Sequence, residues 1–287
     1  MTVACGGTFP MCSRHPEFPK DPRTCMVYSP LDMDRVLRET SVARAEHHPT
    51  LSSTNDRARE CAEEGAGALP LLVVADVQTA GRGRGAHRWW TGQGSLAFSV
   101  LLDPGQAAVG RGGQSPLVAL AAAVAVVEAV APLVGSHGVG INWPNDVVAR
   151  GPACGWRKLA GVLVEVLPDG RQIVGIGVNT NNSLAEAPPE VRLVATTLRE
   201  LTGVTHDQTT ILVTLLQHLE ARLGELAPEP GRIGTSADAL CLQRGRLLTL
   251  DRGGELVSGR CAGIAPDGAL LLDTPDGRQA FYWGMLK

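Results

Sequence analysis

Residues 139–167 read VGINWPNDVVARGPACGWRKLAGVLVEVL, and this stretch decides the fold. Its apolar runs at 139–143 and 160–167 predict two strands, because short apolar runs bounded by turn residues suit strands buried in a sheet. A third run, 172–178, follows the Pro-Asp-Gly of residues 168–170, which is typical of a tight turn. The last two strands are therefore expected to form a hairpin within one sheet.

Helices and further strands are predicted on both sides of this stretch. A capped helix is expected from Ser53 or Thr54 to Gly65, since hydroxyl side chains favour helix starts and glycine favours helix ends. Apolar runs predict strands at 71–75 and 95–102, and a buried helix at 117–130. Leucine or isoleucine at every fourth position predicts an amphipathic helix over 207–226. This mixture indicates an α/β (α+β) domain.

The two ends of the chain differ from this pattern. Five prolines interrupt residues 1–45, which predicts an irregular N-terminal extension. Residues 228–234 are rich in proline and glycine and are expected to be a linker. After Arg244, short apolar runs at 247–250, 256–264, 269–272 and 280–283 alternate with glycine turns, as in a small β-barrel. The expected units are an extension over 1–45, a main domain over 46–234 and a β domain over 240–287.

Composition excludes several classes of protein. The net charge of −3 argues against a general nucleic-acid binder, which would carry a basic surface. Seven cysteines without a Cys-x-x-Cys pair predict neither disulfides nor a zinc site. No secretory signal is apparent, and the apolar run Leu117–Val127 is shorter than the roughly 20 residues that span a bilayer. A cytoplasmic protein with no membrane partner is expected.

A glycine- and arginine-rich segment, Gly81-Arg82-Gly83-Arg84-Gly85, lies between two predicted strands. Glycine allows the backbone to approach a ligand closely, and arginine matches phosphate and carboxylate oxygens with a planar fork of donors. Taken alone, the segment is more simply a solvated turn. Its place between apolar strands, just before Trp89-Trp90, favours a binding loop.

Three further candidates lie in or after the opening stretch. Asn142-Trp143-Pro144-Asn145-Asp146 supplies oriented polar groups or is only a turn at a strand end. Lys158 places a cation beside an apolar strand, although most single lysines simply reach the surface. Gly175 and Gly177 interrupt an apolar run ending at Asn179, and glycine within a strand often marks the close approach of a ligand. Each signal is weak by itself.

The order of these motifs resembles that of biotin protein ligases over roughly residues 50–285. The motifs are Ser53-Thr54-Asn55, Gln78, Gly81-Arg82-Gly83-Arg84 with Trp89, Trp143-Pro144-Asn145-Asp146, Lys158-Leu159-Ala160-Gly161 and Gly177-Val178-Asn179. The specific part is the Trp-Pro-Asn-Asp and Lys-Leu-Ala-Gly pair. The resemblance implies a mixed-sheet catalytic domain of the biotin/lipoate ligase type, followed by a small SH3-like β domain.

The resemblance also implies roles for individual residues. Those implied to bind biotin are Ser53, Thr54, Asn55, Gln78, Arg82, Gly83, Arg84, Lys158 and Gly161. Those implied to bind the nucleotide are Arg82, Arg84, Trp89, Asn145, Asp146 and Asn179. Lys158, Arg84 and Asp146 are implied to be catalytic. No protein-only metal cluster is expected, and Mg²⁺ is expected to arrive with ATP near Asp146.

The implied activity is ATP-dependent formation of biotinyl-AMP and transfer of biotin to a lysine of a biotin carboxyl carrier domain, by a monomer or homodimer. The sequence departs from the family at Ala86-His87-Arg88, where a further Gly-Arg is usual, and at Asn142, where a basic residue is frequent. Alternatives are a lipoate or octanoate transferase, an inactive biotin sensor and a DNA-binding repressor. Residues 1–45 are too short and proline-rich for a winged helix, so DNA binding is not expected.

Overall fold

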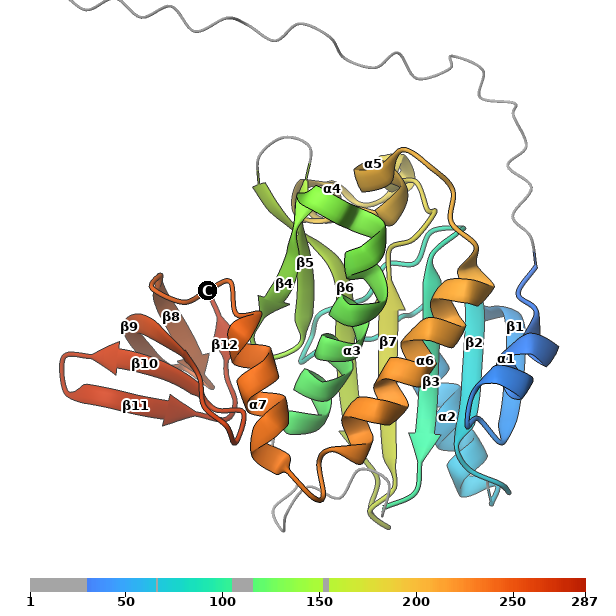
Figure 1. Ribbon diagram of the computed structural model, residues 1–287, viewed down its shortest axis with the longest axis horizontal. Coiled ribbons are helices and arrows are strands. Elements are labelled where there is room, and N and C mark those ends of the chain that lie inside the picture. Colours follow the sequence, from blue (N-terminus) through green and yellow to red (C-terminus); the bar gives the residue numbers. More distant parts are fainter. Residues whose placement is uncertain (1–29, 66, 105–115, 152–154) are drawn as a thin grey trace, which may run out of the picture.

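The computed structural model of this chain describes residues 30–65, 67–104, 116–151 and 155–287 (Figure 1). Seven strands form the main sheet, in the order β1-β2-β3-β7-β6-β5-β4. Only the β1–β2 pair is parallel, so the sheet is mixed, as the family resemblance implies. The strands are β1 (Arg44–Leu51), β2 (Leu71–Gln78), β3 (Leu96–Leu102), β4 (Val139–Asn142), β5 (Asp146–Gly151), β6 (Gly155–Val166) and β7 (Gln172–Val178).

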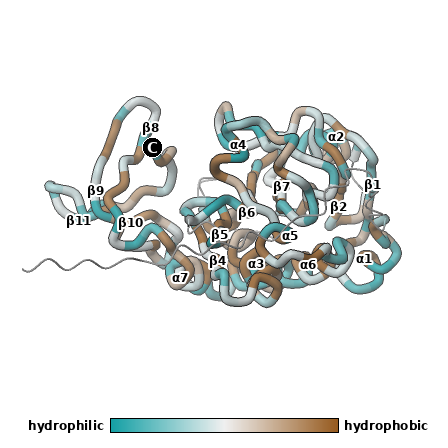
Figure 2. The backbone as a smooth tube through the Cα atoms, turned by 90° about the horizontal axis from the view of Figure 1, so that it is seen from above, coloured by the Kyte–Doolittle hydropathy of each residue, from teal (hydrophilic) through white to brown (hydrophobic). Residues whose placement is uncertain are grey.

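Helices cover both faces of this sheet (Figure 2). One face carries α1 (Met33–Glu39), α3 (Leu117–Val134), α6 (Gln208–Gly224) and α7 (Pro230–Ala239). The other face carries α2 (Thr54–Glu63), whose Ala58, Cys61 and Ala62 pack on buried residues of β2, β3 and β7. Two short helices, α4 (Pro189–Val194) and α5 (Leu198–Thr202), follow β7.

The apolar helix α3 is the centre of the larger core. By length and composition, Leu117–His137 could cross a membrane, but 72% of its most apolar window is buried within the fold. Its alanine and valine side chains pack against the sheet and against α6. The expectation of a buried core helix is therefore confirmed. The high hydropathy of α3 reflects its position in the core, where apolar side chains are buried.

The C-terminal residues form a second sheet with the order β11-β10-β9-β8-β12, in which every pair is antiparallel. Its strands are β8 (Leu247–Arg252), β9 (Glu255–Ile264), β10 (Leu270–Thr274), β11 (Gly277–Phe281) and β12 (Met285–Leu286). This confirms the prediction of a small β unit after the main sheet.

Trp143 joins the two sheets. Its side chain is only 2% exposed, and its indole Nε1–H donates to the carbonyl of Gly268, between β9 and β10, at 2.9 Å. Its backbone N–H donates to Oε1 of Gln243, 2.8 Å away. The chain leaving α7 also pairs with β4, since Ile141 N–H donates to the carbonyl of Leu240. The Trp-Pro-Asn-Asp motif therefore docks the C-terminal unit as well as lining the cavity described below.

Two predictions about chain organisation are wrong. The irregular extension was expected to reach residue 45, but residues 33–39 form α1, which Asp32 caps by accepting from the Arg35 N–H, and β1 begins at Arg44. Residues 1–29 lie outside the described part. The expected linker over 228–234 instead runs into α7, which begins at Pro230. Proline suits the first position of a helix because its missing N–H would have no intrahelical partner there.

Candidate functional site

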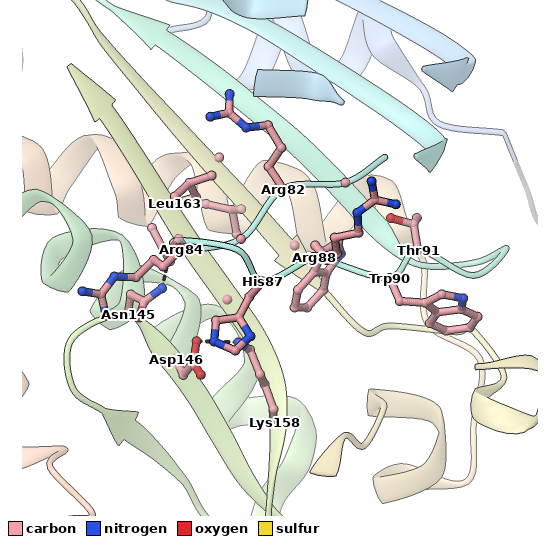
Figure 3. Close-up of a pocket in the computed structure, with 18 of the residues that line it drawn as sticks. Arg82, Arg84, His87, Arg88, Trp90, Thr91, Asn145, Asp146, Lys158 and Leu163 are labelled. Atoms are coloured by element: carbon pink, nitrogen blue, oxygen red, sulfur yellow. Dashed lines mark hydrogen bonds and ion pairs between the residues drawn. The ribbon is translucent and has the colours of Figure 1, made fainter. Parts of the chain in front are cut away.

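A cavity of about 1020 Å³ lies over the main sheet, beneath the glycine- and arginine-rich loop and next to β12 (Figure 3). Every residue to which the sequence assigned a binding or catalytic role lines it. They are Ser53, Thr54, Asn55, Gln78, Arg82, Gly83, Arg84, Trp89, Asn145, Asp146, Lys158, Gly161 and Asn179. Residues up to 126 positions apart in the sequence (Ser53 and Asn179) thus share one cavity.

The parallel pair β1 and β2 brings the first polar group into the cavity. Leu51 at the end of β1 lies opposite Gln78 at the end of β2, and the chain turns from β1 into α2 within two residues. Ser53 and Thr54 are consequently buried at the start of α2. The Thr54 N–H donates to Gln78 Oε1 at 2.7 Å, so this turn and the end of β2 are held together.

Asn55 sits in a buried hydrogen-bonding network. The Ser99 hydroxyl on β3 donates to its Oδ1 at 2.6 Å, and its Nδ2 donates to Glu165 on β6 at 2.8 Å. Gly175 on β7 makes room for it, because a Cβ at that position would lie only 2.0 Å from Asn55 Oδ1. The space that Gly175 leaves is therefore filled by Asn55, a side chain of the protein itself.

A β-bulge places the catalytic lysine candidate. The β5–β6 register shifts between Val147 and Val148, so that Leu159 is the extra residue on β6. In a regular strand, Lys158 and Gly161 would face opposite sides of the sheet, because they are three positions apart; the bulge at Leu159 lets both face the cavity. The Lys158 ammonium lies 2.6 Å from Asp146 Oδ1, and Figure 3 shows the two facing each other. Lys158 lies within β6, not before it as the sequence suggested.

Trp89 lines the cavity and packs against two strand glycines. A Cβ on Gly177 would meet its indole at 2.3 Å, and one on Gly161 would lie 3.3 Å from it. The Lys158 ammonium is 5.7 Å from the ring centroid, a cation–π distance. The buried Trp89 Nε1–H has no hydrogen-bond partner, which leaves one donor available to a ligand in this cavity.

The two loop arginines point in different directions. Arg82 forms ion pairs with Asp56 and Glu165, both at 2.8 Å. Burial lowers its pKa, but these carboxylates outweigh burial and raise the pKa overall. Arg84 is more deeply buried and donates to the carbonyl of Gly284, 3.0 Å away beside β12. Burial lowers the pKa of Arg84, while the negative charge of Asp146 opposes the shift.

The remaining predicted residues support the cavity wall. Asn145 Nδ2 donates to the Val162 carbonyl at 2.6 Å and so ties the turn after β4 to β6. Asn179 is 3% exposed, and its Oδ1 accepts from Asn182 at 3.2 Å. The Gly83 N–H donates to the His87 carbonyl at 2.9 Å, closing the tip of the loop.

Two residues that contact the predicted set were not singled out in the sequence. Ser99 is fully buried within the apolar strand β3, and Glu165 is the single charged residue among the valines and leucine of residues 162–166. A polar residue inside an apolar strand was the available signal, since such a group needs a partner. Met285 and Leu286 of β12 also line the cavity, which only the docking of the C-terminal unit reveals.

Two family models match the chain. Residues 48–181 match the biotin/lipoate A/B protein ligase family, and residues 246–284 match the biotin protein ligase C-terminal domain. The first match contains the cavity residues on α2 and on β2 to β7, and the second contains all of β8 to β11. The two matched segments thus cover most of the main sheet and most of the C-terminal sheet.

Sequence relatives and a solved structure agree with these matches. The bifunctional ligase/repressor BirA of Bacillus subtilis is 31% identical over 245 residues, 82% of this chain and 71% of the relative. The biotin–[acetyl-CoA-carboxylase] ligase of Mycobacterium tuberculosis is 34% identical over 225 residues, 77% and 80% of the two chains. A structure of biotin protein ligase from Aquifex aeolicus in complex with biotin and ATP aligns with a TM-score of 0.71 and 29% identity, covering 85% of this chain and 98% of that one.

The chain therefore belongs to the biotin/lipoate A/B protein ligase family. Its C-terminal domain and its named relatives place it among the biotin protein ligases of that family. The resemblance seen in the sequence motifs is confirmed.

Proposed function

We propose that this enzyme activates biotin with ATP to biotinyl-5'-AMP and transfers the biotinyl group to a lysine of a biotin carboxyl carrier domain, in the cytoplasm. The observation that carries the proposal is the ammonium of Lys158, which shares one cavity with a buried polar pocket and with two loop arginines. The family and a relative's structure with biotin and ATP supply the substrate class.

Biotin fits the end of the cavity formed by Ser53, Thr54, Asn55 and Gln78. These side chains offer both donors and acceptors, which suits the N–H and C=O groups of biotin's ureido ring. Ser53, Thr54 and Asn55 are each less than 5% exposed, so hydrogen bonds made there are shielded from water. The valeryl chain would then extend along the strand glycines toward Lys158.

In the first step an oxygen of the biotin carboxylate attacks the α-phosphorus of ATP, and pyrophosphate leaves. The attack brings two anions together, so positive charge must be present before it begins. Lys158, Arg82 and Arg84, which all line the cavity, supply that charge. The buried indole Nε1–H of Trp89, which has no partner in the protein, supports a role for Trp89 as a donor to the nucleotide or to the acyl phosphate.

Mg²⁺ would accompany ATP and screen its phosphates when bound. In the part of the chain that the structure describes, no group of three or more metal-binding side chains gathers. The carboxylate of Asp146 faces the cavity beside Lys158. One carboxylate fits a Mg²⁺ ion that is held mainly by phosphates and water, so Asp146 is the residue proposed to hold it.

In the second step the neutral amine of a carrier lysine attacks the biotinyl carbonyl, an amide forms, and AMP leaves with the bonding electron pair. Asp146 is placed to orient that amine or to accept its proton. The loop carrying Arg84 closes over the cavity against Gly284, which would keep water from the acyl phosphate.

The test is to incubate the protein with biotin, ATP, Mg²⁺ and a carrier domain, and to measure the mass of the carrier. A mass gain equal to one biotinyl group is expected, with one pyrophosphate released per turnover. Lipoate and octanoate in place of biotin serve as matched substrates. A gain with either acid but not with biotin would overturn the proposal. Specific retardation of a promoter fragment by the protein would overturn the expectation that it does not bind DNA.

A further inference from the structure

We propose that Glu165 is a positioning residue for biotin, which fixes the carboxamide of Asn55 and holds Arg82 at the biotin end of the cavity. The inference rests on the proposed biotin site and adds a residue to it. Glu165 lies on β6 outside the lining of the cavity, so it acts through the two residues that it holds.

Glu165 is saturated with hydrogen bonds. Its Oε2 accepts from Asn55 Nδ2 at 2.8 Å and from Arg82 Nη1 at 3.1 Å. Its Oε1 accepts from Arg82 Nη2 at 2.8 Å and from Arg59 Nη2 at 2.9 Å. The Glu165 side chain is only 15% exposed. One largely buried carboxylate therefore connects α2, β6 and the loop, and its contact with Arg82 is bidentate, the geometry that restricts an arginine most.

The charge of Glu165 determines which way the Asn55 amide faces. A carboxylate only accepts hydrogen bonds, so it can face Nδ2 of Asn55 but not Oδ1. On the opposite side, the Ser99 hydroxyl donates to Oδ1 at 2.6 Å. The carboxylate therefore selects the orientation, the Ser99 hydroxyl can serve it as a donor, and Gly175 leaves the room in which Asn55 Oδ1 sits, because a Cβ there would lie only 2.0 Å from it. Biotin would thus meet an Asn55 whose donor and acceptor are already in place, without a cost of ordering at binding.

Glu165 also decides where Arg82 rests. Asp56 offers Arg82 a second contact, but the Asp56 side chain is 39% exposed and receives one hydrogen bond at 2.8 Å. Without Glu165, Arg82 would keep only this more solvated partner, and an exposed ion pair holds a side chain weakly. The first arginine of the loop would then be free to leave the biotin end of the cavity.

Two variants separate the functions of Glu165. Glu165→Ala removes both contacts, and we expect the Kd for biotin, measured by calorimetry without ATP, to rise about tenfold or more. Glu165→Gln keeps the shape and one acceptor for Asn55 but loses the charge that holds Arg82, so a smaller rise is expected. The KM for ATP at saturating biotin should change less than the biotin Kd in both variants. A purely structural role would instead lower thermal stability and affect both substrates alike.

Two matched controls lie next to this network. Arg59→Gln removes the third partner of Glu165, and Arg59 does not line the cavity. Glu60→Gln removes a carboxylate on α2, the helix that carries Asn55 and Arg59, and the Glu60 side chain is 58% exposed. Both controls should bind biotin as the wild-type protein does. A rise in Kd with the Glu60 control equal to that of Glu165→Gln would overturn the assignment.

The decisive measurement is a double-mutant cycle between Glu165→Ala and Asn55→Ala. Because Glu165 acts partly through Asn55 and partly through Arg82, the losses in the double variant should be clearly less than additive. Fully additive losses, or wild-type affinity in Glu165→Ala, would overturn the proposal while leaving the proposed function intact. Failure of the wild-type protein itself to bind biotin would overturn both.

Discussion

The substitution Gly175→Ala tests whether strand glycines shape the biotin pocket. An added Cβ would lie 2.0 Å from Asn55 Oδ1, whereas ordinary contacts begin at 3.4 Å. The Asn55 amide must therefore retreat by roughly 1.4 Å, the difference between the two values. That shift would break its hydrogen bonds to Ser99 and Glu165, which now measure 2.6 and 2.8 Å.

The expected loss of affinity follows from the hydrogen bonds that a correctly held Asn55 amide would make to biotin. A neutral hydrogen bond contributes about 1 kcal/mol, and one to a charged group about 1.5–3 kcal/mol. If the displaced amide cannot serve biotin, affinity should fall by about 2 kcal/mol, roughly a 30-fold rise in Kd. Biotin calorimetry measures this directly, with a thermal melt to confirm that the variant is folded.

The matched control is Gly155→Ala, at the start of the neighbouring strand β6, where an added Cβ would meet nothing within 4 Å. It carries the same chemical change without the collision, so its biotin Kd should equal that of the wild-type protein. If folded Gly175→Ala also binds biotin with wild-type affinity, the network around Asn55 does not control the pocket, and the reasoning is refuted.

Three further outcomes are expected. Lys158→Ala should slow pyrophosphate release about 10- to 100-fold while the biotin Kd changes less, because the ammonium stabilises charge that grows in the transition state. Pyrophosphate release at the wild-type rate would show that Lys158 has no catalytic role. Trp143→Ala should lower the free energy of unfolding, measured in urea, by about 3–5 kcal/mol, because it leaves a cavity where the buried indole was and leaves the Gly268 carbonyl without its donor. A change below about 1 kcal/mol would contradict the docking role of Trp143. Arg57 lowers the pKa of Glu46 to about 2, so the stability that this carboxylate adds is complete above its ordinary pKa of 4.5 and is lost as the pH falls through about 2. Urea melts should therefore show that Glu46→Gln is less stable than the wild-type protein at pH 7 and equally stable at the acid limit. Equal stability at pH 7 would contradict the ion pair.

Local sequence patterns predicted most of the elements of this fold. The apolar runs predicted β3 and β7 close to their observed bounds and the second half of β6, which begins five residues earlier than expected, and the four-residue spacing of leucine and isoleucine predicted α6. Elements with short or polar sequences were missed: α1, β1, β5 and α7 among them. Their residues show little periodicity, and they are stabilised by pairing or packing against distant segments.

The candidate site was predicted by the order of its motifs, and every predicted residue lines the cavity. The directions of the side chains were not predictable. Arg82 and Arg84 are each flanked by glycines in the sequence, so nothing local distinguishes them. In the structure, however, Arg82 contacts α2 and β6, whereas Arg84 reaches Gly284. Gly175 and Gly177 suggested an approaching ligand, and the structure shows Asn55 and Trp89 in the space that they leave.

By itself, then, the sequence determined the strand and helix types, the two-part organisation and the family, because turn chemistry, periodicity and motif order are local properties of the chain. Only the tertiary structure decided that a one-residue bulge turns Lys158 toward Asp146 and that Glu165 holds Asn55 from 110 residues away. Both depend on the register of paired strands, which the packing of the whole sheet selects and no single segment encodes.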